Sequence, residues 1–478
     1  METTNNTSRK RYIVTYVDQN ADFARAEQIL HVQPGTIKDG VSLLESDKPL
    51  TAKDVLHFDG LGSSSVVLSE TEAKNLRRDD QVLAVEEDLE VHALGVEDLL
   101  SVPSAPASNG GTQYYDLNDS NVYDGQLGLD GPTPQPVTNA PDQGFQAGYQ
   151  QALTDTYSRM LGQLNAIFGV APAAAGPVPS PVPVRPIIPV RPILPPLTPP
   201  IFQQPIPWNI AMVKAPQAWP RTRGRGIKVA VLDTGIASHP DLIISGGASF
   251  VPGVTSYHDG HGHGTHCAGI IGARNNFLGV VGVAPQCNVY AVKVLNDAGS
   301  GQLSWILAGM AWARQNGMQV VSMSLGSNSG PVVAYTIAVQ QLLAMGCVVV
   351  AAAGNNGPAG TVGAPANSPG VIAVGAVDQH RVIAPFSSRG GTGNQVTISA
   401  PGVSVNSTHL SNGYRSMSGT SMACPHVAGA AALVRMRYPT WTPAQITRRL
   451  VTTASDLGFP GNDTTYGAGL LNCDAATM

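Results

Sequence analysis

The sequence carries few charges: Asp, Glu, Lys and Arg make up 13% of its 478 residues, about half of the usual share. The net charge of -5 gives no reason to expect nucleic acid or an anionic membrane surface as a partner. Apolar runs are also short. None approaches the ~18–20 residues that a membrane helix requires, so we expect no membrane partner.

Cysteine is scarce, and no two cysteines form a CxxC pair. The five are Cys267, Cys287, Cys347, Cys424 and Cys473. An odd number leaves at least one unpaired within the chain, so we favour free thiols in a reducing compartment, with a disulfide framework as the alternative. The first residues, METTNNTSRKRYIVTYV, show no apolar stretch followed by a small-residue cleavage site, so no secretory signal is visible.

The chain is longer than one typical domain, and it is rich in glycine and proline, so two or more units are expected. After a tail (residues 1–9), residues 10–94 predict a small α+β domain. Its expected strands are RYIVTYV, SSSVVLSE and QVLAVEED, and its expected helices are ADFARAEQIL and SETEAKNLRR. Ser69 or Thr71 is placed to cap the second helix.

Residues 95–202 form a low-complexity, proline-rich linker. The stretch GPVPSPVPVRPIIPVRPILPPLTPP repeats PVRPII almost unchanged as PVRPIL. So much proline predicts an extended polyproline II conformation. Two roles stay open for it, a stiff spacer or a ligand for a proline-binding module.

Residues 203–478 alternate short apolar strands with helices. The runs IKVAVLD, NVYAVKVL, VVSMSLG, CVVVAAAG and VIAVGAV are almost wholly apolar, as strands buried on both faces of a parallel sheet are. The expected helices are LSWILAGMAWARQNG, AYTIAVQQLLAMG and TSMACPHVAGAAALVRMRY. This pattern predicts an α/β domain with a doubly wound, mostly parallel sheet.

Two motifs place an acid and an imidazole in this domain. Asp233 ends an apolar strand in IKVAVLDTG, where α/β sheets place their sites. Aspartic proteases also use DTG, but they need two such carboxylates, and no second DTG or DSG occurs. His263 stands between two glycines in HDGHGHGTHCAG, where the backbone can pass close to another group. Its neighbours include three more histidines, which raises a zinc site as an alternative, although no Glu or Cys lies at a common zinc spacing.

A third motif, SMSGTSMACPHVAGAAALV, places Ser421 at the start of a helix. The amino end of a helix supplies positive potential beside this hydroxyl. We expect Pro425 within the first turn, where its missing N–H costs little. Asp233, His263 and Ser421 follow one another in the chain order of one of the convergent Ser-His-Asp triads.

The motifs DTG, HGTHCAG and GTSMACPHVAG resemble the three catalytic motifs of the subtilisin-like (S8) serine proteases. The similarity runs through residues 203–478. It implies a serine endopeptidase that works through an acyl-enzyme, with Ser421 as nucleophile, His263 as general base and Asp233 orienting the imidazole. Asn355, in AAAGNNG, resembles the oxyanion-hole amide of the family. Cys267 resembles the free thiol of the proteinase K branch.

The resemblance also implies how polypeptide substrates bind. An extended peptide would pair with two backbone segments, Gly299-Ser300-Gly301 and Ser324-Leu325-Gly326. The second segment, with Ala351–Gly354 and Gly363, would line the pocket for the residue before the cleaved bond (the S1 pocket for P1). These residues are small and uncharged, so a broad preference for large apolar P1 residues is expected.

Calcium is the cofactor that the resemblance implies. The side chains of Gln204, Asp241 and Asn276 and the carbonyls of Arg274, Leu278 and Val280 resemble the ligands of the family's tight calcium site. All are the hard oxygen donors that Ca²⁺ prefers. An ordinary surface loop, closed by Asn275, Asn276 and Gly279, is the alternative.

Residues 10–94 resemble the family's inhibitory pro-domain, so the protein's own N-terminal part is expected as an intramolecular inhibitor of a monomeric enzyme. Leu94 would fill S1, and the chain would cut itself after this residue. The spacer would then either be removed by a second cut near Phe202–Gln203 or stay attached as an N-terminal extension, and both outcomes stay open. The family is often secreted, whereas the missing signal favours the cytoplasm or a leaderless route, and localisation stays open. Two other functions compete with a serine endopeptidase. One is an inactive scaffold that recruits partners through the proline-rich arm, and the other is a metallopeptidase built on the histidines.

Overall fold

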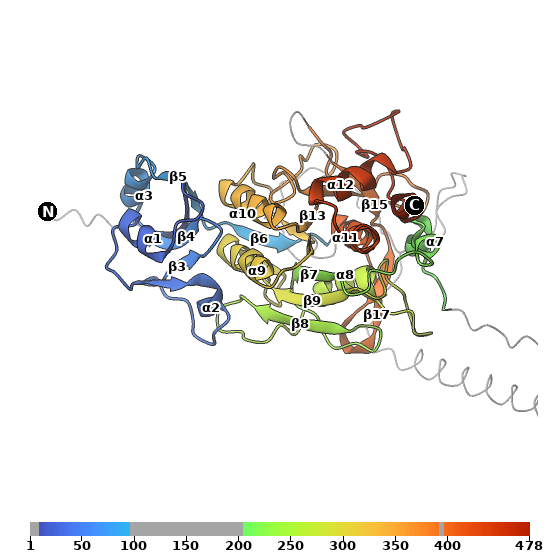
Figure 1. Cartoon of the computed structure of the whole chain (residues 1–478), viewed down its shortest axis with the longest axis horizontal. Coiled ribbons are helices and arrows are strands. Elements are labelled where there is room, and N and C mark those ends of the chain that lie inside the picture. The colour runs from blue at the N-terminus through green and yellow to red at the C-terminus, as the bar shows by residue number, and fades with distance from the viewer. Residues whose placement is uncertain (1–8, 96–203, 392–395) are drawn as a thin grey trace, which may run out of the picture. The chain divides into compact units, whose positions relative to one another are not determined.

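Seven parallel strands form the centre of the C-terminal segment in the computed structural model (Figure 1). The structure describes residues 9–95, 204–391 and 396–478. The sheet order is β15 (Ile398–Pro401), β14 (Ile372–Val377), β13 (Val348–Ala352), β11 (Val320–Met323), β7 (Lys228–Asp233), β9 (Asn288–Lys293) and β8 (Ile244–Ser249). The predicted doubly wound, mostly parallel sheet is confirmed, because every neighbouring pair runs parallel.

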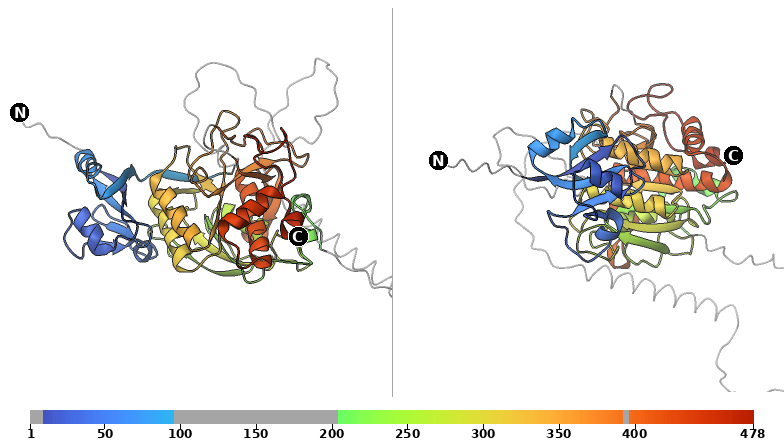
Figure 2. Two further views of the ribbon diagram at one scale, coloured as in Figure 1. Left: turned by 45° about the horizontal axis from the view of Figure 1, so that its top comes forward. Right: turned by 60° about the vertical axis from the view of Figure 1, so that its left-hand side comes forward.

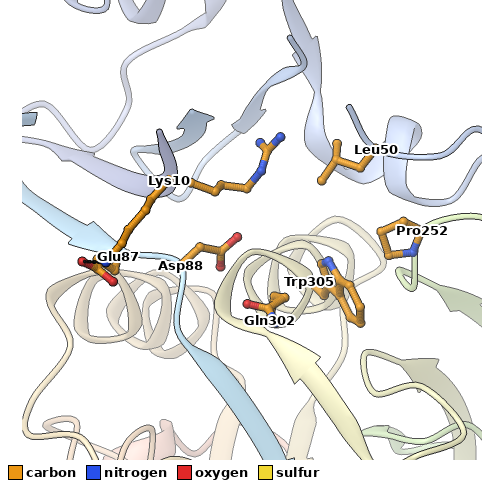
Figure 3. Close-up of a pocket in the computed structure, with 8 residues that line it drawn as sticks. Lys10, Leu50, Glu87, Asp88, Pro252, Gln302 and Trp305 are labelled. Carbon is orange, nitrogen blue, oxygen red and sulfur yellow. Dashed lines mark hydrogen bonds and ion pairs between the residues drawn. The ribbon is translucent and has the colours of Figure 1, made fainter. Parts of the chain in front are cut away.

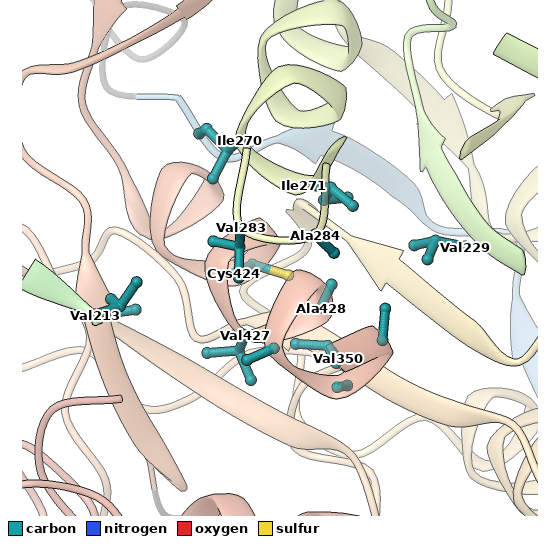
Figure 4. Close-up of a cluster of buried hydrophobic side chains, with 14 of the residues drawn as sticks. Val213, Val229, Ile270, Ile271, Val283, Ala284, Val350, Cys424, Val427 and Ala428 are labelled. Atoms are coloured by element: carbon teal, nitrogen blue, oxygen red, sulfur yellow. The ribbon is translucent and has the colours of Figure 1, made fainter. Parts of the chain in front are cut away.

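Helices cover both faces of this sheet. α9 (Leu303–Gln315) and α10 (Val333–Ala344) lie on one face, and α8 (His263–Gly272) and α11 (Thr420–Arg437) lie on the other. Figure 4 shows side chains of α8 and α11 packed with Val229 and Val350 of the sheet. Alternate residues of β7 enter the two cores, since Val229 belongs to one cluster and Ala230 to the other. The strand is therefore buried on both faces, which explains its continuous apolar sequence.

Shorter elements complete the C-terminal segment. They are α6 (Trp208–Met212), α7 (Ala215–Ala218), α12 (Pro443–Thr452), α13 (Cys473–Thr477), the 3₁₀ turn Leu410–Asn412, and the hairpin of β16 (Val405–Thr408) and β17 (Tyr414–Met417). α12 begins with a capping box formed by Thr442 and Gln445. Such boxes satisfy helix amides that would otherwise lack partners.

Helix α11 is deeply buried. All its residues from Thr420 to Arg435 are buried, which accounts for its many small side chains. One expectation about this helix was wrong: Pro425 is its sixth residue and therefore lies beyond the first turn. A proline there removes a backbone hydrogen bond from the helix interior, and the lost bond is the one to the carbonyl of Ser421.

Residues 9–95 form a second sheet with the order β2-β3-β4-β1-β5, here named the N-terminal module. Its strands are β2 (Ile37–Asp39), β3 (Val55–Phe58), β4 (Ser63–Leu68), β1 (Lys10–Tyr16) and β5 (Val82–Glu87), and its helices are α1 (Phe23–Ile29), α2 (Gly40–Leu44) and α3 (Glu70–Leu76). The three predicted strands and two predicted helices are present, whereas β2, β3 and α2 were not predicted. Ser69 caps α3 in a capping box with Glu72.

The N-terminal module packs against α9 and α10 (Figures 1 and 2). Strand β1 alternates between two cores: Tyr12 and Val14 pack within the module, whereas Ile13 joins the cluster that contains α9 and α10. A pocket at this contact is lined by residues from both sides, including Asp88 and Trp305 (Figure 3).

Two carboxylates of the module cap helices of the C-terminal segment. Neither α9 nor α10 has a side-chain cap at its own N-cap residue. Glu86 accepts hydrogen bonds from the amides of Val333 (2.8 Å) and Ala334 (3.0 Å) at the start of α10. Asp88 accepts from the amide (2.8 Å) and the hydroxyl (2.7 Å) of Ser304 in α9. The module therefore satisfies helix-end amides that the C-terminal segment leaves unpaired.

All five cysteines are buried and carry free thiols. Within the described ranges, no helix has both the length and the hydropathy needed to span a membrane. The predicted N-terminal tail (except Arg9), the polyproline linker and the alternative cut near Phe202 lie outside the described residues.

Candidate active site

The carboxylate of Asp233 and the imidazole of His263 meet at the carboxyl end of strand β7, inside the parallel sheet. Asp233 is the last residue of β7, and His263 is the first of α8. Asp233 Oδ1 lies 2.7 Å from His263 Nδ1, and both residues are fully buried. A Cβ on Gly264 would lie 2.1 Å from the carbonyl oxygen of Gly235, so only glycine lets α8 approach the end of β7 this closely. The carboxylate favours the tautomer with a proton on Nδ1, which leaves Nε2 as the basic nitrogen.

A second carboxylate, which our sequence analysis missed, holds the loop before α8. Asp259 is fully buried, and its Oδ1 accepts from the amides of His261 (2.9 Å) and Gly262 (2.8 Å). Its Oδ2 accepts from the amide (2.9 Å) and hydroxyl (2.6 Å) of Thr265. Asp259 thus fixes the amino end of the helix that begins with His263. The visible signal was an aspartate four residues before His263, a residue type that often caps the start of a helix.

Ser421 is the second residue of α11 and is fully buried. Its hydroxyl donates a hydrogen bond to the carbonyl oxygen of Ser324 at 2.9 Å. Cys267 Sγ lies 3.5 Å from the carbonyl oxygen of Ser421. Burial, together with the charge of Asp233, raises the pKa of the Cys267 thiol well above its usual value. The thiol therefore stays protonated and acts as a weak donor, since nucleophilic attack and metal binding require the thiolate.

The four histidines of the second motif do not assemble into a common site. His266 Nε2 is held by the carbonyl oxygens of Val405 (3.0 Å) and Arg415 (2.9 Å), and burial lowers the pKa of His266 to about 3. Among the described residues, a group with metal-ligating atoms within 4.8 Å of one another consists of Asp233, His263 and Cys267. It contains one of the four histidines, so the arrangement does not support the zinc alternative.

Asn355 faces a carbonyl group of the N-terminal module. Its Oδ1 accepts from the amide and the hydroxyl of Thr420, each at 2.9 Å, which fixes the side-chain amide. Its Nδ2 donates to the carbonyl oxygen of Leu94. That oxygen also lies 2.4 Å from the place a Cβ on Gly419 would occupy, directly at the start of α11. The Leu94 carbonyl therefore lies where backbone and side-chain N–H groups can stabilise negative charge on oxygen.

The chain leading to Leu94 lies as an extended strand between two others. Strand β6 (Glu90–Ala93) pairs antiparallel with β10 (Ser300–Gln302) on one side and with β12 (Leu325–Gly326) on the other. Two further bonds extend the pairing: the amide of Ala93 donates to Gly299 (2.9 Å), and the amide of Leu94 donates to Ser324 (3.1 Å). All six predicted peptide-pairing residues therefore lie along this strand.

The glycines predicted to line S1, and Gly301 of the predicted pairing segment, have different surroundings. A Cβ on Gly326 would lie 3.1 Å from Leu94 Cδ1, so Gly326 faces the Leu94 side chain directly. Gly354 has a φ of +114° and binds the hydroxyl of Thr420 through its amide at 3.2 Å. Gly363 approaches the carbonyl oxygen of Ser327, to which its Cβ would lie 2.3 Å away. Gly301 packs tightly, because its Cβ would lie 2.3 Å from the carbonyl oxygen of Val294.

The predicted calcium residues gather around the amide of Gln204. Its Nε2 lies close to three carbonyl oxygens, those of Arg274 (3.2 Å), Leu278 (2.7 Å) and Val280 (2.6 Å). The backbone amide of Asn276 donates to Gln204 Oε1 at 2.7 Å, and the side-chain Oδ1 of Asn276 accepts from the amide of Leu278 at 3.0 Å. Oxygen atoms thus converge on one point in the loop.

Asp241 contributes a carboxylate to the same loop. Its Oδ2 accepts from the amide of Val280 (3.0 Å) and from the hydroxyl of Tyr414 (2.8 Å). Its Oδ1 is buried and has no hydrogen-bond partner. An unpaired buried carboxylate oxygen next to converging carbonyls is the donor chemistry that a hard cation needs.

Comparison with known proteins agrees with this geometry. Residues 224–469 match the model of the Subtilase family, peptidase S8. Subtilisin Savinase of Lederbergia lenta is 52% identical over 275 residues, which are 57% of this chain and 99% of that protein. A thermostable alkaline protease of Halalkalibacterium halodurans is 52% identical over 278 residues (58% of this chain, 75% of that protein), and subtilisin E of Bacillus subtilis is 50% identical over 283 residues (58% and 72%). The chain therefore belongs to the Subtilase family and is a serine endopeptidase with the subtilisin fold.

Proposed function

We propose that Ser421, His263 and Asp233 carry out peptide-bond hydrolysis as a catalytic triad. The buried 2.7 Å contact between Asp233 and His263 supports the orienting role of the carboxylate. The place of Ser421 at the start of α11 supports its role as nucleophile, because the helix end stabilises developing negative charge.

In this mechanism the Ser421 hydroxyl turns from the Ser324 carbonyl toward His263 Nε2 and gives up its proton there. Ser421 Oγ then forms a bond to the substrate carbonyl carbon, and the carbonyl oxygen gains the negative charge. Asn355 Nδ2 and the Ser421 amide donate to that oxygen. His263 passes its proton to the leaving amine as the peptide bond breaks, and an acyl-enzyme remains. Water then attacks the acyl carbon and gives a proton to His263, and His263 returns a proton to Ser421 Oγ as the ester bond breaks and the acid product leaves.

The observation that carries the proposal is the position of Leu94. Its carbonyl oxygen binds Asn355, and its strand is paired on both sides as an extended substrate would be. We therefore propose residues 10–94 as an inhibitory pro-domain, residues 203–478 as the catalytic domain and the Leu94–Gly95 bond as the first bond that the enzyme cuts. The fit of Leu94 against Gly326 supports a preference for large apolar P1 residues in polypeptide substrates.

We also propose a structural calcium site in the loop around Gln204. The converging carbonyls of Arg274, Leu278 and Val280 and the unpaired oxygen of Asp241 fit a hard cation. Asn276 would add a side-chain oxygen. Gln204 would add another after a 180° rotation of its side-chain amide exchanges Oε1 and Nε2, two atoms that are assigned from the hydrogen bonds they make. The bound ion would stabilise the loop and the start of the catalytic domain, and it takes no part in the chemistry.

Ser421→Ala in the full chain tests the triad and the first cut together. The variant should stay uncleaved at Leu94, and a fluorophosphonate that labels the wild-type protein at Ser421 should not label it. Ser418→Ala is the matched control, because Ser418 precedes α11 and its hydroxyl accepts from the Ser404 amide instead (2.9 Å). Cleavage after Leu94 by Ser421→Ala, or loss of labelling in Ser418→Ala alone, contradicts the proposal.

A further inference from the structure

The helix that carries the nucleophile has a gap in its hydrogen-bond ladder at the nucleophile itself. In an α-helix, each carbonyl accepts from the amide four residues later. For Ser421 that residue is Pro425, which has no N–H. The Ser421 carbonyl lies in a fully buried residue and is out of reach of water, and a buried carbonyl without a partner is costly.

Ser324 supplies the missing donor from outside the helix. Its hydroxyl donates to the carbonyl oxygen of Ser421 at 2.8 Å, and Ser324 is almost fully buried. Cys267 Sγ lies 3.5 Å from the same oxygen, and a thiol is a weaker donor than a hydroxyl. Because Ser324 directly follows β11, the peptide unit of the nucleophile is bonded to the carboxyl end of the middle strand of the central sheet.

The backbone carbonyl of Ser324 binds both reacting partners. It accepts from the hydroxyl of Ser421 (2.9 Å) and from the amide of Leu94 (3.1 Å). One residue thus contacts the nucleophile through its hydroxyl and the P1 residue through its carbonyl. The spacing between the attacking oxygen and the carbonyl it attacks depends on the place of Ser324, and small errors in such spacing cost rate steeply.

We propose that the Ser324 hydroxyl is a positioning group for catalysis, which replaces the N–H that Pro425 lacks and holds Ser421 in register with the P1 carbonyl. The inference rests on the proposed role of Ser421 as nucleophile. It assigns Ser324 a function that peptide pairing does not require, because pairing uses its backbone carbonyl alone.

A double-mutant cycle between positions 324 and 425 tests the proposal in the processed protein, produced from the full-length chain. Ser324→Ala should lower kcat by about 10-fold. KM for a peptide should change less than about 2-fold, because the carbonyl that binds the P1 amide remains. Pro425→Ala restores an N–H for the Ser421 carbonyl, so in that background Ser324→Ala should lower kcat by less than about 3-fold.

Further variants keep the test independent of folding. Ser324→Thr retains the hydroxyl and should keep most of kcat. Ser322→Ala is the matched control, because Ser322 is buried on β11 and its hydroxyl faces Cys424 Sγ (3.6 Å). If Ser324→Ala lowers kcat equally in the wild-type and Pro425→Ala backgrounds, or raises KM with kcat unchanged, the proposal is overturned. Fluorophosphonate labelling separates the two levels: a wild-type protein not labelled at Ser421 refutes the proposed triad, whereas labelled variants without coupling refute only the role of Ser324.

Discussion

The two carboxylates that cap α9 and α10 should contribute strongly to inhibition by the N-terminal module. Glu86→Gln removes the charge from two backbone hydrogen bonds at the start of α10. Hydrogen bonds to charged groups and helix caps each contribute about 1–3 kcal/mol, so the inhibition constant of the module should rise by about 5–150-fold. Asp88→Asn should raise the inhibition constant less. Burial raises the pKa of Asp88, because it disfavours the charged carboxylate, and this cost offsets part of the free energy contributed by the hydrogen bonds to Ser304.

The assay starts from the processed complex, in which the bond after Leu94 is cut and the module is still bound. The complex is diluted serially, and hydrolysis of a chromogenic peptide reports the fraction of uninhibited enzyme. Glu87→Gln is the matched control, since the neighbouring Glu87 is exposed and pairs with Lys10 of its own module at 2.9 Å. If Glu86→Gln and Glu87→Gln shift the inhibition constant equally, or neither shifts it by more than about 2-fold, the capping argument is wrong.

Three further outcomes are expected. Leu94→Asp places a charge against the apolar S1 wall and should slow cleavage of the precursor by about 100-fold or more on a gel time course. The Leu94→Met precursor should be cleaved at the wild-type rate. An unchanged rate for the Asp variant would exclude Leu94 as the P1 residue. Chelation of calcium should lower the melting temperature by about 5–10 °C, as loss of an ion present at about 100 times its Kd does, and Asp241→Asn should abolish this difference; a melting point that chelator does not change in the wild type refutes the site. His57 is buried, and its ring contacts Ser64 and the carbonyl of Ala21. Burial lowers the pKa of His57 below its usual 6.5, despite the nearby carboxylates of Asp59, Asp39 and Asp22. The unfolded chain therefore binds the proton more readily than the folded one, and the stability contributed by neutral His57 is lost as the pH falls below about 6.5. In the Ser421→Ala precursor, His57→Gln should reduce the loss of melting temperature between about pH 7.5 and about pH 5, and an equal loss in both proteins counts against this role of His57.

The sequence was most informative where one physical requirement decides the residues. Strand β7 is buried on both faces and is therefore apolar throughout before it ends at Asp233. Its neighbour β8, ISGGAS, was missed because it is made of small residues. Gly247 explains that composition: a Cβ there would lie 2.1 Å from the carbonyl oxygen of Ala291 on β9. Close backbone approach removes the apolar alternation on which strand prediction relies.

The same contrast holds for the candidate site. The acid, the imidazole and the hydroxyl of the proposed triad each stand in a local motif at the end of an element, and the sequence alone could therefore propose them. Glu86 and Asp88 could not be assigned, because a carboxylate that caps a helix from another part of the fold leaves no local pattern. The position of Pro425 inside α11 was misjudged for a similar reason. The hydrogen bond that Pro425 cannot donate to the Ser421 carbonyl is replaced by one from Ser324, about a hundred residues away in the chain.

The pairing of β6 on both sides has a consequence for the timing of the proposed activation. The proposed cut after Leu94 would remove none of the hydrogen bonds of β6, so the module would hold its place as firmly as before. What changes is the tether. Before the cut, the module is covalently joined through residues 95–203 to Gln204, so a module that dissociates rebinds at a high effective concentration. After the cut, rebinding depends on the concentration of the free module in solution. Dilution, rather than the cut alone, then sets when the enzyme begins to act on other chains.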